Sequence, residues 1–235
     1  MKTAFVTGVG RRLGNAIAHR LLDQGYQVQG HYRTDNQAVQ SLAERGATLH
    51  RCDLTDTSAL LDMANTLAQL PSLDFVVHNA SCFQPEPTDL AAKAAWAADC
   101  LAVHVQAPMI INEAVFEAMQ RSENDPNVIH ITDIFAERPD PQYRSYTAAK
   151  AGLDNLALSY AQLWAPKVRV NRLQPGPILF LPEHSDEHKA KVLAHTLLQR
   201  EGGLEPVLQA IDLLRTNAYL TGAVIKVDGG RFLAE

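Results

Sequence analysis

Cysteine and basic charge are both scarce in this sequence. The 235 residues include three cysteines, Cys52, Cys82 and Cys100, and none of them belongs to a C-x-x-C pair. An odd number of cysteines without such a pair argues against a disulfide framework or a zinc cage and favours a reducing compartment. Lysine and arginine number 21 against 26 acidic residues, which gives a net charge of −5. This balance provides no reason to expect nucleic acid or an anionic membrane as a partner.

Long hydrophobic runs are also missing from the sequence. The stretch from Met1 to Gly8 has too few apolar side chains for the core of a signal peptide. No later run approaches the ~18 apolar residues of a membrane span. No linker, repeat or low-complexity stretch divides the chain, and one α/β core accommodates this length. We therefore expect a single cytoplasmic domain over residues 1–235.

Short apolar runs alternate with amphipathic segments from one end of the chain to the other. The runs are mostly β-branched or aromatic at their centres and end at Gly, Asp, Asn or Pro, as buried parallel strands do. The segments between them place apolar residues at helical spacing. This alternation predicts an α/β fold with one doubly wound parallel sheet of about seven strands and helices on both faces. The predicted strands are Ala4–Val6, Val28–Tyr32, Thr48–Cys52, Phe75–His78, Val128–Thr132, Val168–Leu173 and Ala223–Val227.

One polar region, Leu181–Gly203, interrupts this alternation. It is rich in histidine and glutamate, and loops at the carboxyl ends of strands often carry function in such sheets. We therefore expect a mobile substrate lid near residues 181–203. Residues His184–His188 match the H-x-x-E-H pattern of inverted zinc proteases. Because only three positions of that pattern are fixed, the match is easily accidental, and we expect no metal.

A glycine-rich turn follows the first predicted strand and precedes a helix expected from Asn15. Strand, glycine turn and helix form the arrangement that binds a dinucleotide pyrophosphate, because free N–H groups and the helix dipole meet its negative charge. The glycine spacing is not G-x-G-x-x-G, and the alternative is a β–α turn that needs glycine only for tightness. Consecutive arginines favour the phosphate site. Its candidate residues are Gly8, Gly10, Arg11, Arg12, Leu13 and Gly14.

The end of the second predicted strand indicates which dinucleotide is bound. An acidic residue there would bind a ribose 2′-hydroxyl, whereas an arginine would meet the 2′-phosphate of NADPH. Arg33 occupies this position, so we expect NADPH, and we interpret the nearby Asp35 as a helix N-cap. Asp53 and Leu54, after the third strand, are candidates for the adenine site or for another helix cap. The cofactor residues expected on the second strand and just after it are His31, Tyr32, Arg33 and Thr34.

A tyrosine and a lysine one helical turn apart form the candidate proton-transfer site. Tyr146 and Lys150 would lie on the same face of a helix, and an ammonium group lowers the cost of a phenolate. Asp133 lies thirteen residues upstream, at the end of a predicted strand. We expect these three residues to be catalytic, although Y-x-x-x-K alone is a weak pattern whose alternative is a surface pair.

Taken in order, these motifs resemble those of the short-chain dehydrogenase/reductase family. The resemblance covers essentially the whole chain and implies a Rossmann-like domain, NAD(P)-dependent hydride transfer and a homotetramer or homodimer. It implies that Tyr146 is the general acid and that Lys150 binds the cofactor ribose. The motifs are Thr7–Gly14, His78–Ser81, Tyr146 with Lys150, Asn171 with Pro175 and Gly176, and Thr221-Gly222 with Asp228–Gly230. The cofactor residues that the resemblance adds are Asn79, Ala80, Ser81, Pro175, Gly176 and Ile178.

Departures from the usual family pattern resemble the pteridine reductase branch, which includes the bacterial dihydromonapterin reductases. Asp133 stands where the family usually has serine, and Arg12 where it usually has a small residue. The resemblance implies that Phe83 stacks on a pterin, while Arg12 and Ser81 contact both cofactor and substrate. Asp133 and Tyr146 complete the expected substrate site. His104 replaces the family's asparagine, either as part of a proton relay or as a buried hydrogen-bonding residue.

The chemistry of a dihydropterin agrees with these residues. Reduction of a ring C=N requires hydride at carbon and a proton at nitrogen, a flat ring requires an aromatic shelf, and a carboxylate orients its N–H donors. We expect Tyr146 to act as a protonated donor that Asp133 replenishes. The sequence therefore predicts NADPH-dependent reduction of a dihydropterin, of the dihydromonapterin or dihydrobiopterin type or dihydrofolate. The alternatives are a carbonyl or alcohol oxidoreductase and a non-catalytic NADP-binding regulator.

Overall fold

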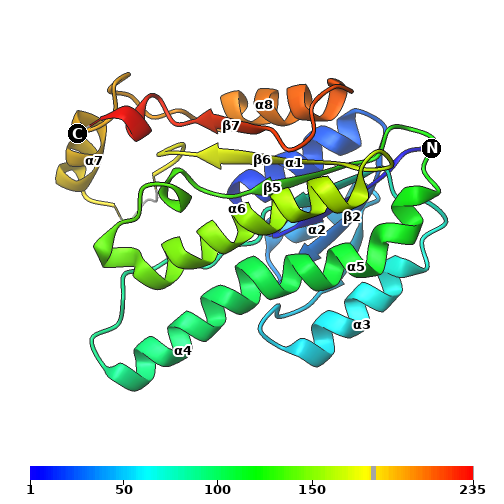
Figure 1. Cartoon of the computed structure of the whole chain (residues 1–235), viewed down its shortest axis with the longest axis horizontal. Helices are drawn as coiled ribbons and strands as arrows, with labels where there is room; N and C mark the ends of the chain where they lie inside the picture. The colour runs from blue at the N-terminus through cyan, green and yellow to red at the C-terminus, as the bar shows by residue number, and fades with distance from the viewer. Residues whose placement is uncertain (181–183, 235) are drawn as a thin grey trace.

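Seven parallel strands form one sheet in the computed structural model, which describes residues 1–180 and 184–234 (Figure 1). The strand order is β3-β2-β1-β4-β5-β6-β7. The strands are β1 (Thr3–Thr7), β2 (Gln27–Tyr32), β3 (Thr48–Arg51), β4 (Phe75–His78), β5 (Asn127–Ile131), β6 (Arg169–Pro175) and β7 (Val224–Val227). The predicted doubly wound sheet is confirmed, and each predicted strand coincides with an observed one.

Helices cover both faces of this sheet (Figure 1). The α-helices are α1 (Arg12–Asp23), α2 (Gln37–Glu44), α3 (Thr57–Ala68), α4 (Leu90–Leu101), α5 (Ala107–Gln120), α6 (Arg144–Trp164), α7 (Asp186–Ala194) and α8 (Glu205–Thr216). A π-helical turn, η1 (Ala102–Gln106), joins α4 to α5. Short 3₁₀ turns are η2 (Ile134–Ala136), η3 (Pro141–Tyr143) and η4 (Arg231–Leu233).

The alternation of side chains along each strand divides the core into two layers. On β1, Ala4 and Val6 pack among apolar residues of α1 and α8, whereas Phe5 between them packs among residues of α3, α5 and α6. This follows from the two-residue period of a strand, which directs successive side chains to opposite faces. Both faces are apolar because parallel sheets of this kind are buried on both sides.

The strand order places the expected site at one edge of the sheet. From β1 the chain winds outward to β3, and it then returns to β4 on the other side of β1. The loops that follow β1 and β4 therefore meet at a topological switch point, which is where ligands bind in open α/β sheets. Both the glycine turn and the Asn79–Phe83 segment lie there.

Two local predictions are wrong. Helix α1 begins at Arg12 rather than at Asn15, so half of the expected loop is its first turn. The N-cap of α2 is Asn36, whose Oδ1 accepts the Val39 N–H at 3.0 Å, and not Asp35. Asn36 also donates to the Gly10 carbonyl at 2.9 Å. Its amide therefore both caps α2 and holds the glycine turn, whereas the carboxylate of Asp35 has no hydrogen to donate to that carbonyl.

Part of the expected lid near 181–203 lies outside the described residues, namely Leu181, Pro182 and Glu183. The remainder contains α7, which Ser185 caps by accepting the His188 N–H. The rings of His184 and His188 lie 4.7 Å apart and face Phe180. The polar composition thus corresponds to an exposed helix beside the carboxyl end of β6 (Figure 1).

One helical run, Leu90–Gln120, is long and apolar enough to cross a membrane by length and composition alone. Lys93, Asp99 and Glu113 interrupt this run, so it passes on mean hydropathy and is not an unbroken apolar stretch of ~18 residues. A single run of this kind is weak evidence for a membrane span, since core helices pass the same test. Its α5 half packs into the core through Ile111, Val115 and Met119.

Candidate active site

The glycine turn after β1 is held by backbone contacts that only glycine permits. Gly8 has a φ of 77° and donates its N–H to the His31 carbonyl at 2.9 Å. A Cβ on Gly14 would lie 2.1 Å from the Gly8 carbonyl oxygen. The first turn of α1 therefore packs directly on the turn, and Arg11 provides no side-chain cap for it. An uncapped helix N-terminus against a glycine turn fits a phosphate group.

Several expected cofactor residues brace this turn instead of facing solvent. Asn79 donates its amide to the Thr7 carbonyl at 3.0 Å, and Ala80 donates its N–H to the Thr7 hydroxyl at 2.9 Å. The buried His31 ring contacts the Gly8 N–H at 3.2 Å and the Cys52 carbonyl at 3.0 Å. Burial lowers the pKa of His31 to about 4, so this brace is neutral. Leu13 and Leu54 have their side chains in the core.

The carboxyl end of β2 presents the residues expected to choose between NADPH and NADH. Arg33 and Thr34 are exposed there. Asp35 points to Arg51, with 3.7 Å between the charged atoms, and also contacts the Tyr32 hydroxyl. Asp53 accepts the Thr55 N–H and hydroxyl, so it forms a local turn and is not the cap of α3, which is Asp56. Arg33 is exposed, and the nearby Asp35 carboxylate already pairs with Arg51. This strand end therefore suits the 2′-phosphate of NADPH.

Asp133, Tyr146 and Lys150 meet at the carboxyl end of β5. The Tyr146 hydroxyl donates to Asp133 Oδ2 at 2.6 Å, and Asp133 Oδ1 accepts the Phe135 N–H at 2.9 Å. Lys150 Nζ donates to the Ile131 carbonyl at 2.9 Å. The chain thus brings its three predicted catalytic side chains together, with Tyr146 and Lys150 buried on one face of α6 and Asp133 half-buried beside them.

Burial determines the protonation of this cluster. Burial, and then the Asp133 carboxylate, raise the pKa of Tyr146 well above its ordinary value, while Ser81 offsets part of the rise. Burial also raises the pKa of Asp133 and lowers that of Lys150 to about 8. Tyr146 is therefore a protonated phenol at neutral pH, and its role as proton donor stays a prediction.

Ser81 links His104 to this cluster. The Ser81 hydroxyl lies 2.9 Å from His104 Nε2, and His104 Nδ1 lies 3.0 Å from the Cys100 carbonyl. Because a carbonyl only accepts, Nδ1 carries the proton and Nε2 accepts from Ser81. Burial, with the Lys150 charge, lowers the pKa of His104 well below its ordinary value. His104 is thus a buried residue that is hydrogen-bonded to the site, and its part in a proton relay stays a prediction.

An aromatic platform lies beside Tyr146. Phe83, 55% exposed, stacks on Tyr143 with 4.6 Å between centroids and meets the Tyr146 ring edge-on at 4.9 Å. The expected shelf therefore exists, and Tyr143 covers one of its faces. Tyr143 was not among the site residues predicted from the sequence, although an aromatic residue one turn before Tyr146 was an available signal.

The segment after β6 closes the other side of the site. A Cβ on Gly176 would lie 2.7 Å from the Asp228 Cα, so the chain there runs directly against the loop after β7. Arg12 donates from the start of α1 to the Leu179 carbonyl, one residue beyond Ile178. This contact bridges the glycine turn and the segment that begins at Pro175, while the expected contacts of Arg12 with cofactor and substrate stay a prediction.

Comparisons with known proteins agree with this geometry. The family described as enoyl-(acyl carrier protein) reductase matches residues 8–231. Dihydromonapterin reductases of Enterobacter and Klebsiella pneumoniae are 35% and 34% identical, over 97% of this chain and 95% of theirs. The NADP complexes of FolM alternative dihydrofolate reductase 1 from Brucella canis and Brucella suis superpose with TM-scores of 0.86 and 0.87, both at 30% identity. Each match covers 100% of this chain, and 95% and 96% of the respective neighbour.

The chain therefore belongs to the short-chain dehydrogenase/reductase family of NAD(P)-dependent oxidoreductases. Within that family it lies in the branch of the dihydromonapterin reductases. Both predictions of membership are confirmed, and the expectation of NADPH agrees with the NADP complexes of the Brucella proteins.

Proposed function

We propose that this protein uses NADPH to reduce a dihydropterin, of the dihydromonapterin or dihydrobiopterin type or dihydrofolate, to its tetrahydro form. The observation that carries the proposal is the hydrogen bond of 2.6 Å from the Tyr146 hydroxyl to the half-buried Asp133 carboxylate, beside the exposed Phe83 ring. Relatives named for dihydromonapterin and dihydrofolate reduction support the same substrate class.

The residues that would hold NADPH surround the switch point. The glycine turn and the α1 N-terminus receive the pyrophosphate, Arg33 the 2′-phosphate, and Lys150 the ribose. Further backbone contacts come from Pro175–Ile178. When bound, the nicotinamide supplies the hydride that is added to the carbon of the pterin C=N bond.

Tyr146 supplies the proton that this reduction requires. Its raised pKa keeps the phenol protonated, so it donates to the ring nitrogen as the hydride arrives. Asp133, whose pKa burial raises, then takes up a proton from solvent and passes it to the tyrosine along their hydrogen bond. A carboxyl group next to the phenol thus stands in place of the serine of the common family pattern and relays the proton that restores the phenol.

Substrate orientation falls to the groups around the tyrosine. The exposed face of Phe83 stacks against the flat heterocycle, and its other face is stiffened by Tyr143. Asp133 and Ser81 offer oxygen acceptors for the pterin amino and ring N–H groups. A ketone has no such donors, which disfavours a carbonyl or alcohol oxidoreductase.

The first experiment is NADPH consumption by the purified protein with dihydromonapterin, dihydrobiopterin, dihydrofolate and a panel of small ketones. We expect turnover of at least one dihydropterin and its loss in Tyr146→Phe. Full dihydropterin turnover by Asp133→Asn would contradict the proton-return step. Binding of NADPH without reduction of any pterin or ketone would favour the non-catalytic regulator.

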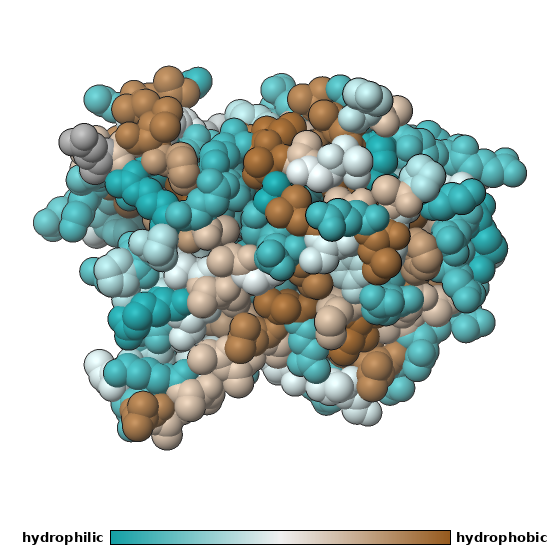
Figure 2. All heavy atoms as spheres, viewed as in Figure 1, coloured by the Kyte–Doolittle hydropathy of each residue, from teal (hydrophilic) through white to brown (hydrophobic). Residues whose placement is uncertain are grey.

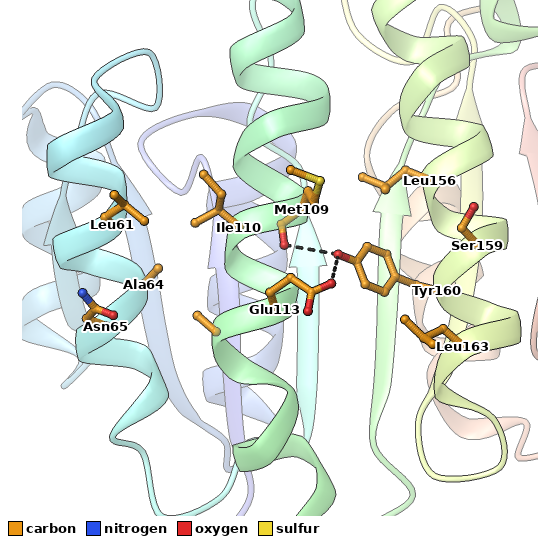
Figure 3. A pocket seen from close by; sticks show the side chains of 11 residues that line it. Leu61, Ala64, Asn65, Met109, Ile110, Glu113, Leu156, Ser159, Tyr160 and Leu163 are labelled. Atoms are coloured by element: carbon orange, nitrogen blue, oxygen red, sulfur yellow. Dashed lines mark hydrogen bonds between the residues drawn. The ribbon is translucent and has the colours of Figure 1, made fainter.

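We also propose that the protein is a homo-oligomer, a homotetramer or homodimer, that pairs through the outer face of α3, α5 and α6. Leu61, Met109 and Leu163 on this face are 46%, 42% and 68% exposed. They line a hollow of about 610 Å³, away from the candidate active site (Figure 3). Tyr160 donates to Glu113 at 2.7 Å, so the acidic group inside the hollow is already paired.

Hydrophobic side chains gather over α4, α5 and α6 in the space-filling view (Figure 2). An exposed apolar face of this extent fits burial against a second copy of the chain. Light scattering after gel filtration tests this, with Leu163→Glu expected to reduce the oligomer size. Tyr219→Glu, at a tyrosine that is 98% exposed on another part of the chain, is the control. A wild-type monomer at micromolar concentration would contradict the proposal.

A further inference from the structure

Two cysteines and a histidine converge beside the candidate active site without a part in the proposed reaction. Cys82 follows Ser81 after β4, Cys100 ends α4, and His104 lies on the π-helical turn η1. Their two sulfur atoms and a ring nitrogen of His104 all lie within 4.8 Å of one another. We propose that Cys82, Cys100 and His104 form a binding site for a thiophilic divalent cation such as Zn²⁺, and that occupation of this site inhibits the reductase.

The spacing of the sulfur atoms suits a shared ion. Cys82 Sγ and Cys100 Sγ lie 3.9 Å apart. Two thiolates on one tetrahedral Zn²⁺, each at ~2.3 Å, are separated by roughly 3.8 Å. A disulfide would require a separation of about 2.05 Å. The thiols are therefore already spaced for a common ligand and would have to approach substantially to bond to each other.

His104 is oriented as a metal-binding histidine. Its Nδ1–H donates to the Cys100 carbonyl at 3.0 Å, which leaves the lone pair on Nε2. Histidines that bind metals commonly donate their other ring N–H to a carbonyl or carboxylate in this way. Cys100 and His104 are four residues apart on a continuous helical segment, so their side chains share one face.

The composition of the site predicts which ions it takes. Two thiolates and one imidazole favour Zn²⁺ and Cd²⁺ over Mg²⁺ and Ca²⁺, which prefer oxygen ligands. Three protein ligands leave a fourth tetrahedral position open for water or another donor. On binding, the two thiols release their protons to solvent, and no oxidation or reduction occurs.

Inhibition follows from the contacts that the ion would replace. His104 Nε2 accepts the Ser81 hydroxyl at 2.9 Å, and a metal on Nε2 removes that acceptor. Ser81 also contacts the Tyr146 hydroxyl, and the His104 ring meets the Tyr146 ring edge-on at 5.4 Å. An ion at this site therefore disturbs the group that holds the transferable proton. This inhibitory half of the inference rests on the proposed function, whereas ion binding does not.

Binding is tested directly with Co²⁺ as a spectroscopic probe, on wild-type protein kept reduced with a phosphine. We expect one equivalent of Co²⁺ to give thiolate charge-transfer absorption and tetrahedral visible bands, and Zn²⁺ but not Mg²⁺ to displace it. Cys100→Ser should weaken binding by about 100-fold or more, since loss of supporting contacts alone costs about 10–100-fold.

Cys52→Ser is the matched control, because Cys52 is a buried free cysteine outside the cluster. It should bind like wild type. Cys82→Ser, at the less buried thiol, provides a second variant should Cys100→Ser fail to fold. Absence of thiolate bands in folded wild type, or equal loss of binding in Cys52→Ser, would overturn the site.

Inhibition is measured separately as dihydropterin reduction with increasing free Zn²⁺. We expect Zn²⁺ to inhibit wild type and Cys52→Ser at the concentration where it displaces Co²⁺, and to spare Cys100→Ser. Zn²⁺ binding with unchanged turnover would overturn the inhibitory half alone. If no substrate is reduced by metal-free protein, the proposed function fails while the Co²⁺ result still decides the metal site.

Discussion

Two neighbouring parts of the site are built in opposite ways. The glycine cradle, residues Thr7–Gly14 with Asn79, is held by backbone contacts and by short polar side chains whose groups are paired. The proton pocket is formed by ionisable or hydrogen-bonding side chains, of which Tyr146, Lys150 and His104 are buried, Asp133 is half-buried and Ser81 is exposed. Close steric fit determines the structure of the glycine cradle, whereas the positions of protons determine the chemistry of the proton pocket.

Substitutions in the glycine cradle and in the proton pocket should therefore change different measured quantities. Added atoms in the cradle collide with the backbone, so stability and cofactor binding should change together. Removal of the Tyr146 hydroxyl or the Asp133 charge leaves the shape of the pocket nearly intact, so kcat should change while cofactor binding persists. The predictions below use that separation, beginning with the largest effect.

Tyr146→Phe should show most clearly that the proton pocket can be altered without an effect on the glycine cradle. Loss of the proton donor should lower kcat for a dihydropterin by about 10²–10⁴-fold. NADPH affinity, measured by fluorescence titration, should be nearly unchanged because the ring and its packing remain. Tyr219→Phe, which removes an exposed phenol elsewhere, is the control. A parallel loss of NADPH affinity in Tyr146→Phe would show that the two parts are not separable.

Acid should destabilise both parts through buried neutral histidines. Burial lowers the pKa of His31, in the cradle, and of His78, beneath the pocket, to about 4 from 6.5. The unfolded chain therefore takes up these protons first as the pH falls below 6.5, and stability is lost progressively between about pH 6.5 and 4. At pH 5 the loss should be roughly 2 kcal/mol for each histidine.

Urea unfolding at pH 7.5, 6 and 5 measures this loss. His78→Gln should flatten the decline of the unfolding free energy with acid, whatever its stability at pH 7.5. His195→Gln, at an exposed histidine, is the comparison and should retain the wild-type slope. Equal slopes for all three proteins would contradict the assignment of the acid response to His78.

Gly14→Ala should damage the cradle by steric overlap. The added Cβ would lie 2.1 Å from the Gly8 carbonyl oxygen, which belongs to the backbone and has little room to move. We expect a loss of about 1–3 kcal/mol in unfolding free energy, with weaker NADPH binding. Gly10→Ala is the matched control, since its Cβ would meet no atom closer than 3.6 Å. A Gly14→Ala protein as stable as Gly10→Ala would refute the steric account.

The fold and the chemistry of the site were predictable from the sequence because both depend on local patterns. Short apolar runs with β-branched or aromatic centres located the seven strands, and the spacing of Tyr146 and Lys150 placed both on one helical face. Contacts between distant segments were not predictable in this way. Tyr143 meets Phe83, and Cys82 meets Cys100, through loop paths that no local pattern describes.

The misplaced helix starts have a related cause. At each of the two helix starts, more than one neighbouring residue could have begun or capped the helix. A contact with a distant part of the chain determined which residue did so. Gly14 lies in the first turn of α1 because Gly8 packs against it. Asn36 rather than Asp35 caps α2 because its amide also reaches Gly10 across the chain. Both choices serve the cradle, so cofactor geometry and helix boundaries are set by the same contacts.

The Asn36 cap provides the smallest and most local test of that view. Asn36→Ala removes both the acceptor for the Val39 N–H and the donor to the Gly10 carbonyl, and should cost about 1 kcal/mol of unfolding free energy. Asp35→Ala removes an exposed ion pair with Arg51 and a contact with the Tyr32 hydroxyl, and should stay within about 0.5 kcal/mol of wild type. Urea unfolding at pH 7.5 compares the two, with NADPH titration of each. Because Asn36 touches the cradle, its replacement should also weaken NADPH binding, and an effect on stability alone would confine its role to α2.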